Sequence, residues 1–399
     1  MLSKKSRLWG AILLVSGTTI GAGMLVLPVI TGPAGFFLSL LLMTLLFLFM
    51  MMTAFYLLEV NLKVKGESNI ISMVHKTLGK PGEVVAWISY LLLLYALTAA
   101  YLVGCSQILT DFLQPLVPAH ILKWGAPLSI FVVFGSFLYF GIAAVDMLNR
   151  ILMMGLFASY ALLFSMGVSY IDVSLLTHSS ISCLASAISV VVTSFGYHII
   201  IPSLSIYLEH DSRMLKKAIV IGSLIPFLIY VAWQFLALGV IPVQGECSLT
   251  HAQELGLQAT FYLKQIIGNP LITTAARGFA FFAIVTSLLG VSLSLSDFLS
   301  DGFKIKKNQI GRFFIILLTF IPPLFFALFY PQGFILALKY AGIFVVILLA
   351  ILPTLMAWRE RYGKERGFRK SEYKVWGGKG VLLSMIVLSF ILLIIEVVV

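Results

Sequence analysis

Charged residues are scarce in this chain of 399 residues, and acidic residues are the scarcest. Asp and Glu number 16 and Lys and Arg 27, so charged residues make up 11% of the sequence. A soluble globular domain carries about 25%. The mean hydropathy is +1.05, and 60% of the residues are hydrophobic. These values exclude a soluble domain and indicate a protein that lies in a lipid bilayer.

Cysteines are few, and sequence motifs of enzymes are missing. The three cysteines, an odd number, predict no disulfide framework. The sequence contains no HExxH pair, no recognisable Ser/His/Asp set and no Walker motif, so neither an enzyme nor a transport ATPase is expected. A selectivity filter or a repeated polar pore segment is not visible either, which argues against a channel. We expect no cofactor.

What the chain contains instead is a series of apolar segments. Eleven are long enough to cross a hydrocarbon core, which needs about 20 residues. They cover residues 8–31, 35–58, 83–110, 125–144, 150–171, 181–206, 217–241, 272–298, 312–330, 333–357 and 380–399. No linker divides them, so the sequence predicts an all-α polytopic membrane protein with one integral domain, residues 1–399.

Basic residues gather on one side of these segments. If the N-terminus is inside, only Lys123, Lys264 and Arg277 of the 27 Lys and Arg residues fall in outer loops, and Lys339 falls within a segment. This asymmetry follows the positive-inside rule, and it predicts a cytoplasmic N-terminus and a C-terminus outside. The net charge of +11 therefore reflects orientation in the bilayer, and no nucleic-acid partner is expected.

Glycine and proline interrupt two of the apolar segments at corresponding places. The first contains GTTIGAGMLVLP at residues 17–28, and the sixth contains TSFGYHIIIPS at residues 193–203. Lipid cannot hydrogen-bond the backbone groups that such a break frees, so the unwound backbone must face protein or a polar cavity. A matched pair of broken helices indicates the substrate site of a secondary transporter.

The breaks also suggest a division of the chain. Each is in the first segment of a possible five-helix repeat, with repeat one at residues 8–171 and repeat two at 181–357. An odd number of spans gives the two repeats opposite orientations in the membrane, which is the inverted-repeat arrangement. The eleventh helix, 380–399, is then an accessory.

The predicted site pairs an anion site with a cation site. The amides of Ala22, Gly23 and Met24 open the second half of the first helix and suit a carboxylate, whereas the carbonyls at 193–195 end a half-helix and suit an ammonium group. A zwitterionic amino acid is therefore the expected small-molecule substrate. The predicted substrate-binding residues are Thr18, Thr19, Gly21, Ala22, Gly23, Met24, Thr193, Ser194, Phe195 and Tyr197.

An aromatic substrate has candidate contacts in this set. Phe195 and Tyr197 lie beside the second break, and aromatic rings pack favourably against one another. The alternative interpretation is that the glycines only allow close helix packing, as the Gly17-x-x-x-Gly21 spacing does in other membrane helices.

These segments resemble those of a known family. Residues 17–28, the SFGYH and IPS sequences within 194–203, and SDFLSDG at 296–302 are similar to motifs of the hydroxy/aromatic amino acid permeases. That family lies in the amino acid/polyamine/organocation superfamily, and the tyrosine-specific branch is the most similar. The resemblance implies the leucine-transporter (LeuT) fold and proton-driven import of tyrosine, tryptophan or phenylalanine across a bacterial cytoplasmic membrane. A serine/threonine permease of the same superfamily is the alternative.

Two candidates are open for the coupling ion. His198 is the histidine that lies deep in a span, and an imidazole exchanges protons near neutral pH. Sodium-coupled members of the LeuT fold imply another site, formed here by Gly17, Ile20, Thr286 and Ser287. Protons are favoured, because this second set contains no carboxylate. Of the other charges, Glu59 lies at a span end, where snorkelling or pairing suffices, and Arg277 has Asp111 and Asp172 as candidate partners, between which the sequence does not select.

Overall fold

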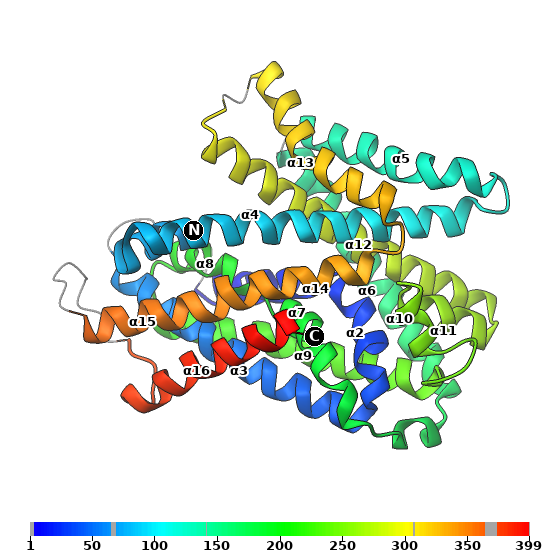
Figure 1. Ribbon diagram of the computed structural model, residues 1–399, viewed down its shortest axis with the longest axis horizontal. Helices are drawn as coiled ribbons and strands as arrows, with labels where there is room; N and C mark the ends of the chain where they lie inside the picture. Colours follow the sequence, from blue (N-terminus) through cyan, green and yellow to red (C-terminus); the bar gives the residue numbers. More distant parts are fainter. Residues whose placement is uncertain (1–3, 65–68, 141, 306–307, 364–372, 399) are drawn as a thin grey trace.

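The computed structural model of the protein describes residues 4–64, 69–140, 142–305, 308–363 and 373–398, and these ranges contain helices and no strand (Figure 1). In chain order the helices are α1 (Lys4–Thr19), α2 (Gly23–Thr31), α3 (Phe36–Lys63), α4 (Ile70–Leu113), α5 (Ala119–Phe140), α6 (Ile142–Gly167), α7 (Ile188–Ser194), α8 (Ile201–Tyr207), α9 (Ser212–Val240), α10 (Leu249–Glu254), α11 (Ala259–Ile267), α12 (Pro270–Gly302), α13 (Gln309–Phe329), α14 (Phe334–Val345), α15 (Leu352–Tyr362) and α16 (Gly378–Val398). A 3-10 turn, η6 (Tyr197–Ile200), precedes α8, and a π-helical turn, η7 (Val346–Ile351), joins α14 to α15.

The number of membrane-spanning segments agrees with the sequence prediction. In the described part of the chain, 10 segments are long and apolar enough to cross a bilayer, and α1 with Gly23–Ala34 forms another that is bent by 53°. The all-α, polytopic fold class is therefore confirmed. The two inverted repeats of the LeuT type stay a prediction.

One helix is longer than its predicted span. We expected a span at residues 83–110, but α4 begins at Ile70 and covers 44 residues. The Asn69 side chain accepts a hydrogen bond from the Ser72 amide at 2.8 Å and so caps the start. Gly79, with φ 75° and ψ −168°, then kinks the chain. An amphipathic first segment is thus joined to the span through a glycine kink.

Short polar side chains fix where other spans begin. The Asp211 carboxylate accepts hydrogen bonds from the amides of Arg213 and Met214, at 3.0 and 3.1 Å, and begins α9. Asn269 and Asn308 cap α12 and α13 in the same way. The first amides of a helix have no partner within the helix, so these caps satisfy donors that lipid leaves unpaired.

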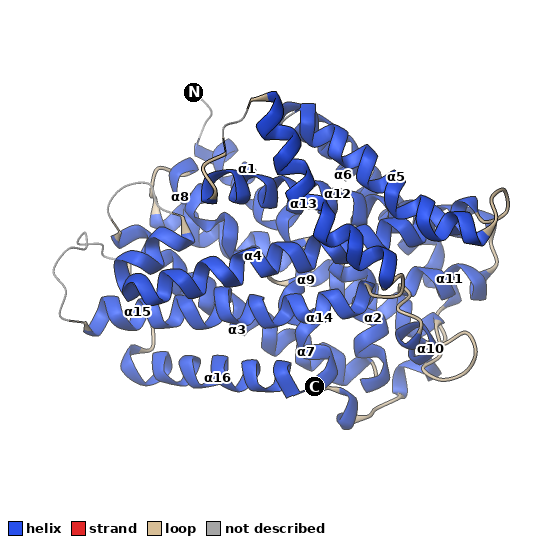
Figure 2. Cartoon of the chain, turned by 45° about the horizontal axis from the view of Figure 1, so that its top comes forward, coloured by secondary structure: helices blue, strands red, loops and turns tan. Residues whose placement is uncertain are grey.

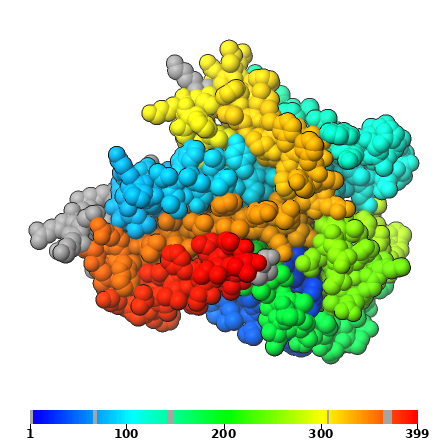
Figure 3. All heavy atoms as spheres, in the orientation of Figure 1, coloured from blue at the N-terminus to red at the C-terminus, as the bar shows by residue number. Residues whose placement is uncertain are grey.

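The broken first span lies inside the bundle. All residues of α2 from Met24 to Thr31 are buried. Helices α5 and α13 lie together at one flank, and α16 lies at the opposite flank along α14 and α15 (Figures 1 and 2). In the space-filling view α16 forms part of the molecular surface (Figure 3).

A loop closes over the end of this span. Ser180 donates its amide hydrogen to the Ala34 carbonyl at 3.0 Å, and His178 Nε2 lies 3.0 Å from the Pro33 carbonyl oxygen. Gly35 has a φ of +88°, and a Cβ there would lie 1.9 Å from the His178 carbonyl oxygen. Only glycine fits this backbone, which returns the chain from the first span into α3.

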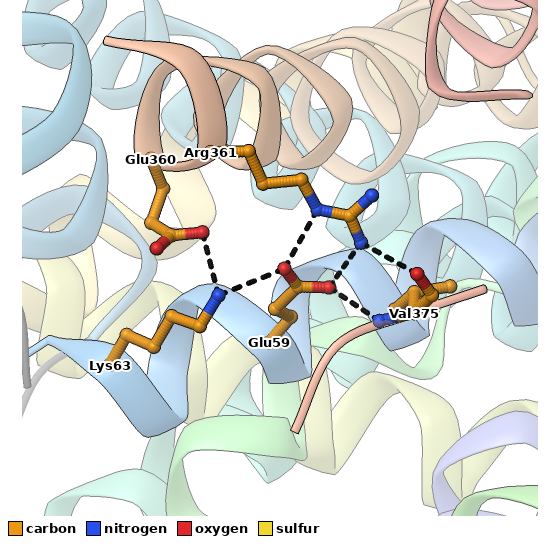
Figure 4. Close-up of polar contacts among 5 residues, drawn as sticks. All are labelled: Glu59, Lys63, Glu360, Arg361 and Val375. Atoms are coloured by element: carbon orange, nitrogen blue, oxygen red, sulfur yellow. Dashed lines mark hydrogen bonds and ion pairs between the residues drawn. The ribbon is translucent and has the colours of Figure 1, made fainter. Parts of the chain in front are cut away.

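An ion network ties three segments together at one end of the bundle (Figure 4). The fully buried Glu59 carboxylate of α3 accepts hydrogen bonds from Arg361 Nε and Nη2 at 2.8 and 2.5 Å. It also accepts from Lys63 Nζ at 3.0 Å and from the Val375 amide at 2.7 Å, and Lys63 bonds Glu360 at 2.9 Å. Glu59 is thus paired, which is one of the two arrangements expected of a charge at a span end.

Candidate functional site

The first break separates α1 from α2 by three residues, Ile20, Gly21 and Ala22. Ile20 donates its amide to the Ser16 carbonyl at 2.9 Å, which is the last bond of α1. Met24 bonds back to the Gly21 carbonyl at 3.2 Å and so starts a new turn. The helix therefore ends and begins again within one turn, at the place that the glycines predicted.

The second break has more irregular backbone. Helix α7 ends at Ser194, Gly196 has φ −81° and ψ 39°, and the 3-10 turn η6 leads into α8. Pro202 occupies the first turn of α8, where a missing amide hydrogen costs nothing. Glycine and proline again bound the interruption.

The two breaks meet in space. A Cβ on Gly23, at the start of α2, would lie 3.0 Å from the Ser194 hydroxyl oxygen at the end of α7. A Cβ on Gly196 would lie 3.4 Å from Leu349 in the π-helical turn η7. Three irregular stretches of backbone, from three different spans, therefore lie against one another.

Helix α12 also reaches the first break. The Ser287 hydroxyl accepts a hydrogen bond from the Ala22 amide at 2.9 Å and donates one to the Ala283 carbonyl at 2.8 Å. A Cβ on Gly21 would lie 2.6 Å from this oxygen. A glycine is therefore needed at this position, and Ser287 holds the unwound segment against α12.

The four members of the candidate sodium set are placed differently. Ser287 lies beside Gly21, whereas a Cβ on Gly17 would meet Met153 of α6 at 3.6 Å. Thr286 donates its hydroxyl hydrogen to the Phe282 carbonyl of its own helix at 2.8 Å. Ile20 is buried at the end of α1. Among the described residues, no group of three or more His, Cys, Asp and Glu side chains could hold a metal ion.

The hydroxyls of the predicted substrate site bond within their own helices. Thr18 and Thr19 donate to the Leu14 and Val15 carbonyls, both at 2.7 Å. Thr193 and Ser194 do the same in α7, at 2.8 and 2.7 Å, toward the carbonyls of Ser189 and Val190. Thr18 is exposed, whereas Thr19 and Ser194 are buried. The hydrogen-bonding groups that face the breaks are therefore mainly those of the backbone.

Sequence reasoning missed Tyr230, a fully buried residue of α9 that connects the two breaks. Its hydroxyl oxygen lies 2.6 Å from the Thr19 carbonyl oxygen and 3.2 Å from that of Ser194. These two carbonyls end the first half of each broken helix. The one hydroxyl hydrogen is shared between the two carbonyl oxygens, with the Thr19 oxygen the nearer, so a single side chain joins the two half-helix ends.

Two further residues of α9 bind the second half of the first span. Trp233 Nε1 donates to the Met24 carbonyl at 2.8 Å, and Gln234 Nε2 donates to the Thr31 hydroxyl at 2.6 Å. Together with Tyr230 they occupy positions i, i+3 and i+4, which lie on one face of a helix. That spacing of polar-tipped side chains in an apolar span was the signal in the sequence.

The predicted aromatic wall is part of a buried cluster. The ring of Phe195 lies 5.5 Å from those of Phe47 and Tyr230 and 6.4 Å from that of Phe227, measured between centroids. Tyr197 is also fully buried. Phe195 therefore packs between the second break and helices α3 and α9.

His198 faces α3. It is fully buried, and its Nε2 lies 2.9 Å from the Thr53 hydroxyl oxygen. Thr53 donates its own hydrogen to the Met50 carbonyl at 2.9 Å, so His198 Nε2 acts as the donor to Thr53. The imidazole thus joins η6 to α3 by a side-chain hydrogen bond.

At the other end of α12, Asp111 is the partner of Arg277. Its Oδ2 lies 3.5 Å from Arg277 Nε and 2.5 Å from Lys264 Nζ of α11. Asp172 instead accepts the Ser174 amide at 2.9 Å in a loop. Of the two predicted partners, the structure selects Asp111, and the contact links α4, α11 and α12.

Known proteins are similar to this chain over nearly its whole length. A profile of the tryptophan/tyrosine permease family matches residues 4–397. Tyrosine-specific transport system 1 of Haemophilus influenzae is 35% identical over an alignment of 393 positions that covers 96% of this chain and 94% of that protein.

Two further relatives from Haemophilus influenzae match over a similar length. Tyrosine-specific transport system 2 is 32% identical, with 98% of this chain and 96% of that protein covered. A tryptophan-specific transport protein is 30% identical, with the same shares covered.

Proposed function

The chain belongs to the tryptophan/tyrosine permease family, and on that premise we propose that it imports aromatic amino acids by proton symport, with tyrosine preferred. It is a transport protein and not an enzyme. We place it in the bacterial cytoplasmic membrane as a multi-pass protein, with the N-terminus inside as the distribution of basic residues predicts.

The observation that carries the proposal is the contact between the two breaks. Helix α2 begins at Gly23, and α7 ends at Ser194. A Cβ added to Gly23 would lie 3.0 Å from the Ser194 hydroxyl oxygen. A helix start carries partial positive charge and a helix end partial negative charge. A carboxylate at the amides of 22–24 and an ammonium group at the carbonyls of 193–195 would therefore be bound side by side, as an α-amino acid requires.

Tyrosine is preferred for two reasons. The relatives that are 35% and 32% identical are named tyrosine-specific, and the one that is 30% identical is named tryptophan-specific. Phe195 and its neighbours Phe47 and Phe227 provide rings next to the break. A hydroxyl-lined pocket would instead favour the alternative, a serine/threonine permease.

Protons are preferred over sodium as the coupling ion. His198 is ionisable, buried and part of the second broken span, and such groups in membrane proteins are commonly functional. The sodium alternative rests on Gly17, Ile20, Thr286 and Ser287. In that set Thr286 and Ser287 already donate to their own helix, and Ser287 accepts from Ala22.

The site is tested by a change at its centre. Gly23→Val places a branched side chain against Ser194 and between the two half-helices, so tyrosine uptake into cells or vesicles should be abolished. Gly290→Val is the matched control, because a Cβ at Gly290 meets nothing within 4 Å, and it should transport normally at equal membrane abundance. Normal uptake by Gly23→Val would remove this site from the proposal.

Substrate and ion are tested together by uptake of labelled tyrosine. Excess tyrosine, tryptophan and phenylalanine should compete, whereas inhibition by serine or threonine alone would support the alternative permease class.

In vesicles without sodium, an inside-alkaline pH gradient should drive accumulation. A strict requirement for sodium would transfer the coupling role to the set at Gly17, Ile20, Thr286 and Ser287.

His198→Ala should lose accumulation but retain exchange of tyrosine across the membrane. The reason is that exchange needs the substrate site alone, whereas accumulation also needs a coupled proton. Accumulation at the level of the unmodified protein would contradict the role of this imidazole.

A further inference from the structure

Helix α16 places a carboxylic acid against the broken sixth span. Glu396 is 8% exposed. The Ser189 hydroxyl of α7 donates a hydrogen bond to its Oε2. Within the described part of the chain, Oε1 is buried and has no hydrogen-bond partner. One oxygen of this acid is therefore satisfied and the other is not.

Three helices pack around this acid. Helix α16 lies against α7 and α14, and its last turn approaches α7 (Figure 1). A Cβ on Gly342 of α14 would lie 2.8 Å from both Cα and Cβ of Ser189. The backbones of α7 and α14 are thus as close as they can be at the residue that bonds Glu396.

Lys339 is the basic residue that faces Glu396 from the neighbouring helices. It lies one turn before Gly342 on α14 and interacts electrostatically with the carboxylate, and no direct ion pair within 4.0 Å joins the two described side chains. Other charged or titratable side chains on the packed segments are Tyr340 on α14 and Arg359, Glu360, Arg361 and Tyr362 at the end of α15. No such side chain lies on α7 or η7.

An ionised carboxylate in this setting is costly. One hydroxyl and a distant ammonium group replace a full hydration shell, and an unpaired charge in the membrane costs several kcal/mol. Binding of a proton at Oε1 removes the charge that burial makes costly. The acid is therefore suited to bind a proton when water is excluded and to release it when water reaches the site.

We propose that Glu396 is a proton-binding site of the transport cycle, additional to His198, and this rests on the proposed function as a proton symporter. The proton comes from the outer aqueous phase, binds Oε1 and leaves as a proton to the inner phase, so no other reactant is needed. Ser189 relays the change of charge to the substrate site.

The relay is short. Ser189 lies five residues before Ser194, or about 7.5 Å along the axis of α7 at 1.5 Å per residue. Its carbonyl accepts the hydroxyl of Thr193 at 2.8 Å, and the carbonyls of 193–195 are the proposed ammonium ligands. When Glu396 is neutral, its hold on Ser189 weakens, which changes how α7 is fixed against α14 and α16.

The test compares Glu396→Gln with the unmodified protein in vesicles. The glutamine has the same shape but binds no proton, so accumulation driven by a pH gradient should be lost while tyrosine exchange persists. Glu246→Gln, the same change at an exposed residue of the loop after α9, should keep accumulation. Glu396→Asp should restore part of it with a changed dependence on external pH.

The outcomes separate this inference from the proposed function. If a pH gradient does not drive the unmodified protein, both fail. If it drives the unmodified protein and Glu396→Gln equally, proton symport stands and the Glu396 site is refuted. Should Glu396→Gln fail to reach the membrane, carbodiimide labelling of the unmodified protein decides, because this reagent attacks protonated carboxyls in apolar surroundings. Labelling of Glu396 that falls as pH rises supports the site, and labelling that does not change with pH overturns it.

Discussion

At the scale of single residues, the site is held by side chains that come from outside the broken helices. Ser287 of α12 accepts the Ala22 amide, and Tyr230 and Trp233 of α9 donate to carbonyls on both sides of the first break. A break in a membrane helix frees backbone groups that need partners. These three residues provide partners for backbone groups that the first break frees, among them the Ala22 amide and the Thr19 and Met24 carbonyls.

Tyr230→Phe tests this support. The change removes one hydroxyl and leaves buried carbonyls at Thr19 and Ser194 without their donor, at a cost of about 1–3 kcal/mol. The affinity for tyrosine in uptake assays should decrease. The amount of protein in the membrane should decrease less. Tyr170→Phe, at an exposed position at the end of a 3-10 turn, is the matched control. Equal kinetic constants for Tyr230→Phe and the unmodified protein would show that the bridge does not position the site.

At the scale of elements, the sequence predicted those features that depend only on neighbouring residues in the chain. Glycine and proline have effects on their own stretch of backbone, so the breaks at 20–22 and 195–200 were visible in the sequence. Tyr230 was not, because it bonds a residue 211 positions away. The same limit applies to Arg361, whose pairing with Glu59 over 302 positions depends on how α3 and α15 pack.

The network at Glu59 makes α3, α15 and the segment before α16 one unit. Glu59→Gln removes the charge between Arg361 and Lys63 and leaves buried cations unpaired, which costs about 3–5 kcal/mol. Thermal unfolding in detergent should occur at a clearly lower temperature. Glu83→Gln, the same change in an exposed pair with His75, should unfold at nearly the original temperature. Equal losses in the two variants would mean that the Glu59 network adds no stability.

At the scale of the whole molecule, the position of the basic residues agrees with the order in which the spans cross the membrane. The basic helix ends, α3 at Lys63 and α15 at Arg359 and Arg361, lie at one end of the bundle, and α10 and α11 lie at the other (Figures 1 and 2). The end with these basic residues also contains the Glu59 network (Figure 4). The positive-inside rule assigns this end to the cytoplasm. The partly exposed Asp111 contact with Lys264 and Arg277 then lies on the outer side.

This orientation predicts where the chain ends. Eleven spans with an inner N-terminus place the residues after α16 outside, so alkaline phosphatase fused after Val399 should be active and a fluorescent protein fused there should stay dark. Fusions in the loop between α9 and α10 should behave the same way, whereas fusions between α8 and α9 should give the reverse pattern. A bright C-terminal fluorescent fusion would require an even number of spans. In that case α16 would cross in the other direction or not at all, and the proposed uptake of a proton by Glu396 from the outer side would not hold.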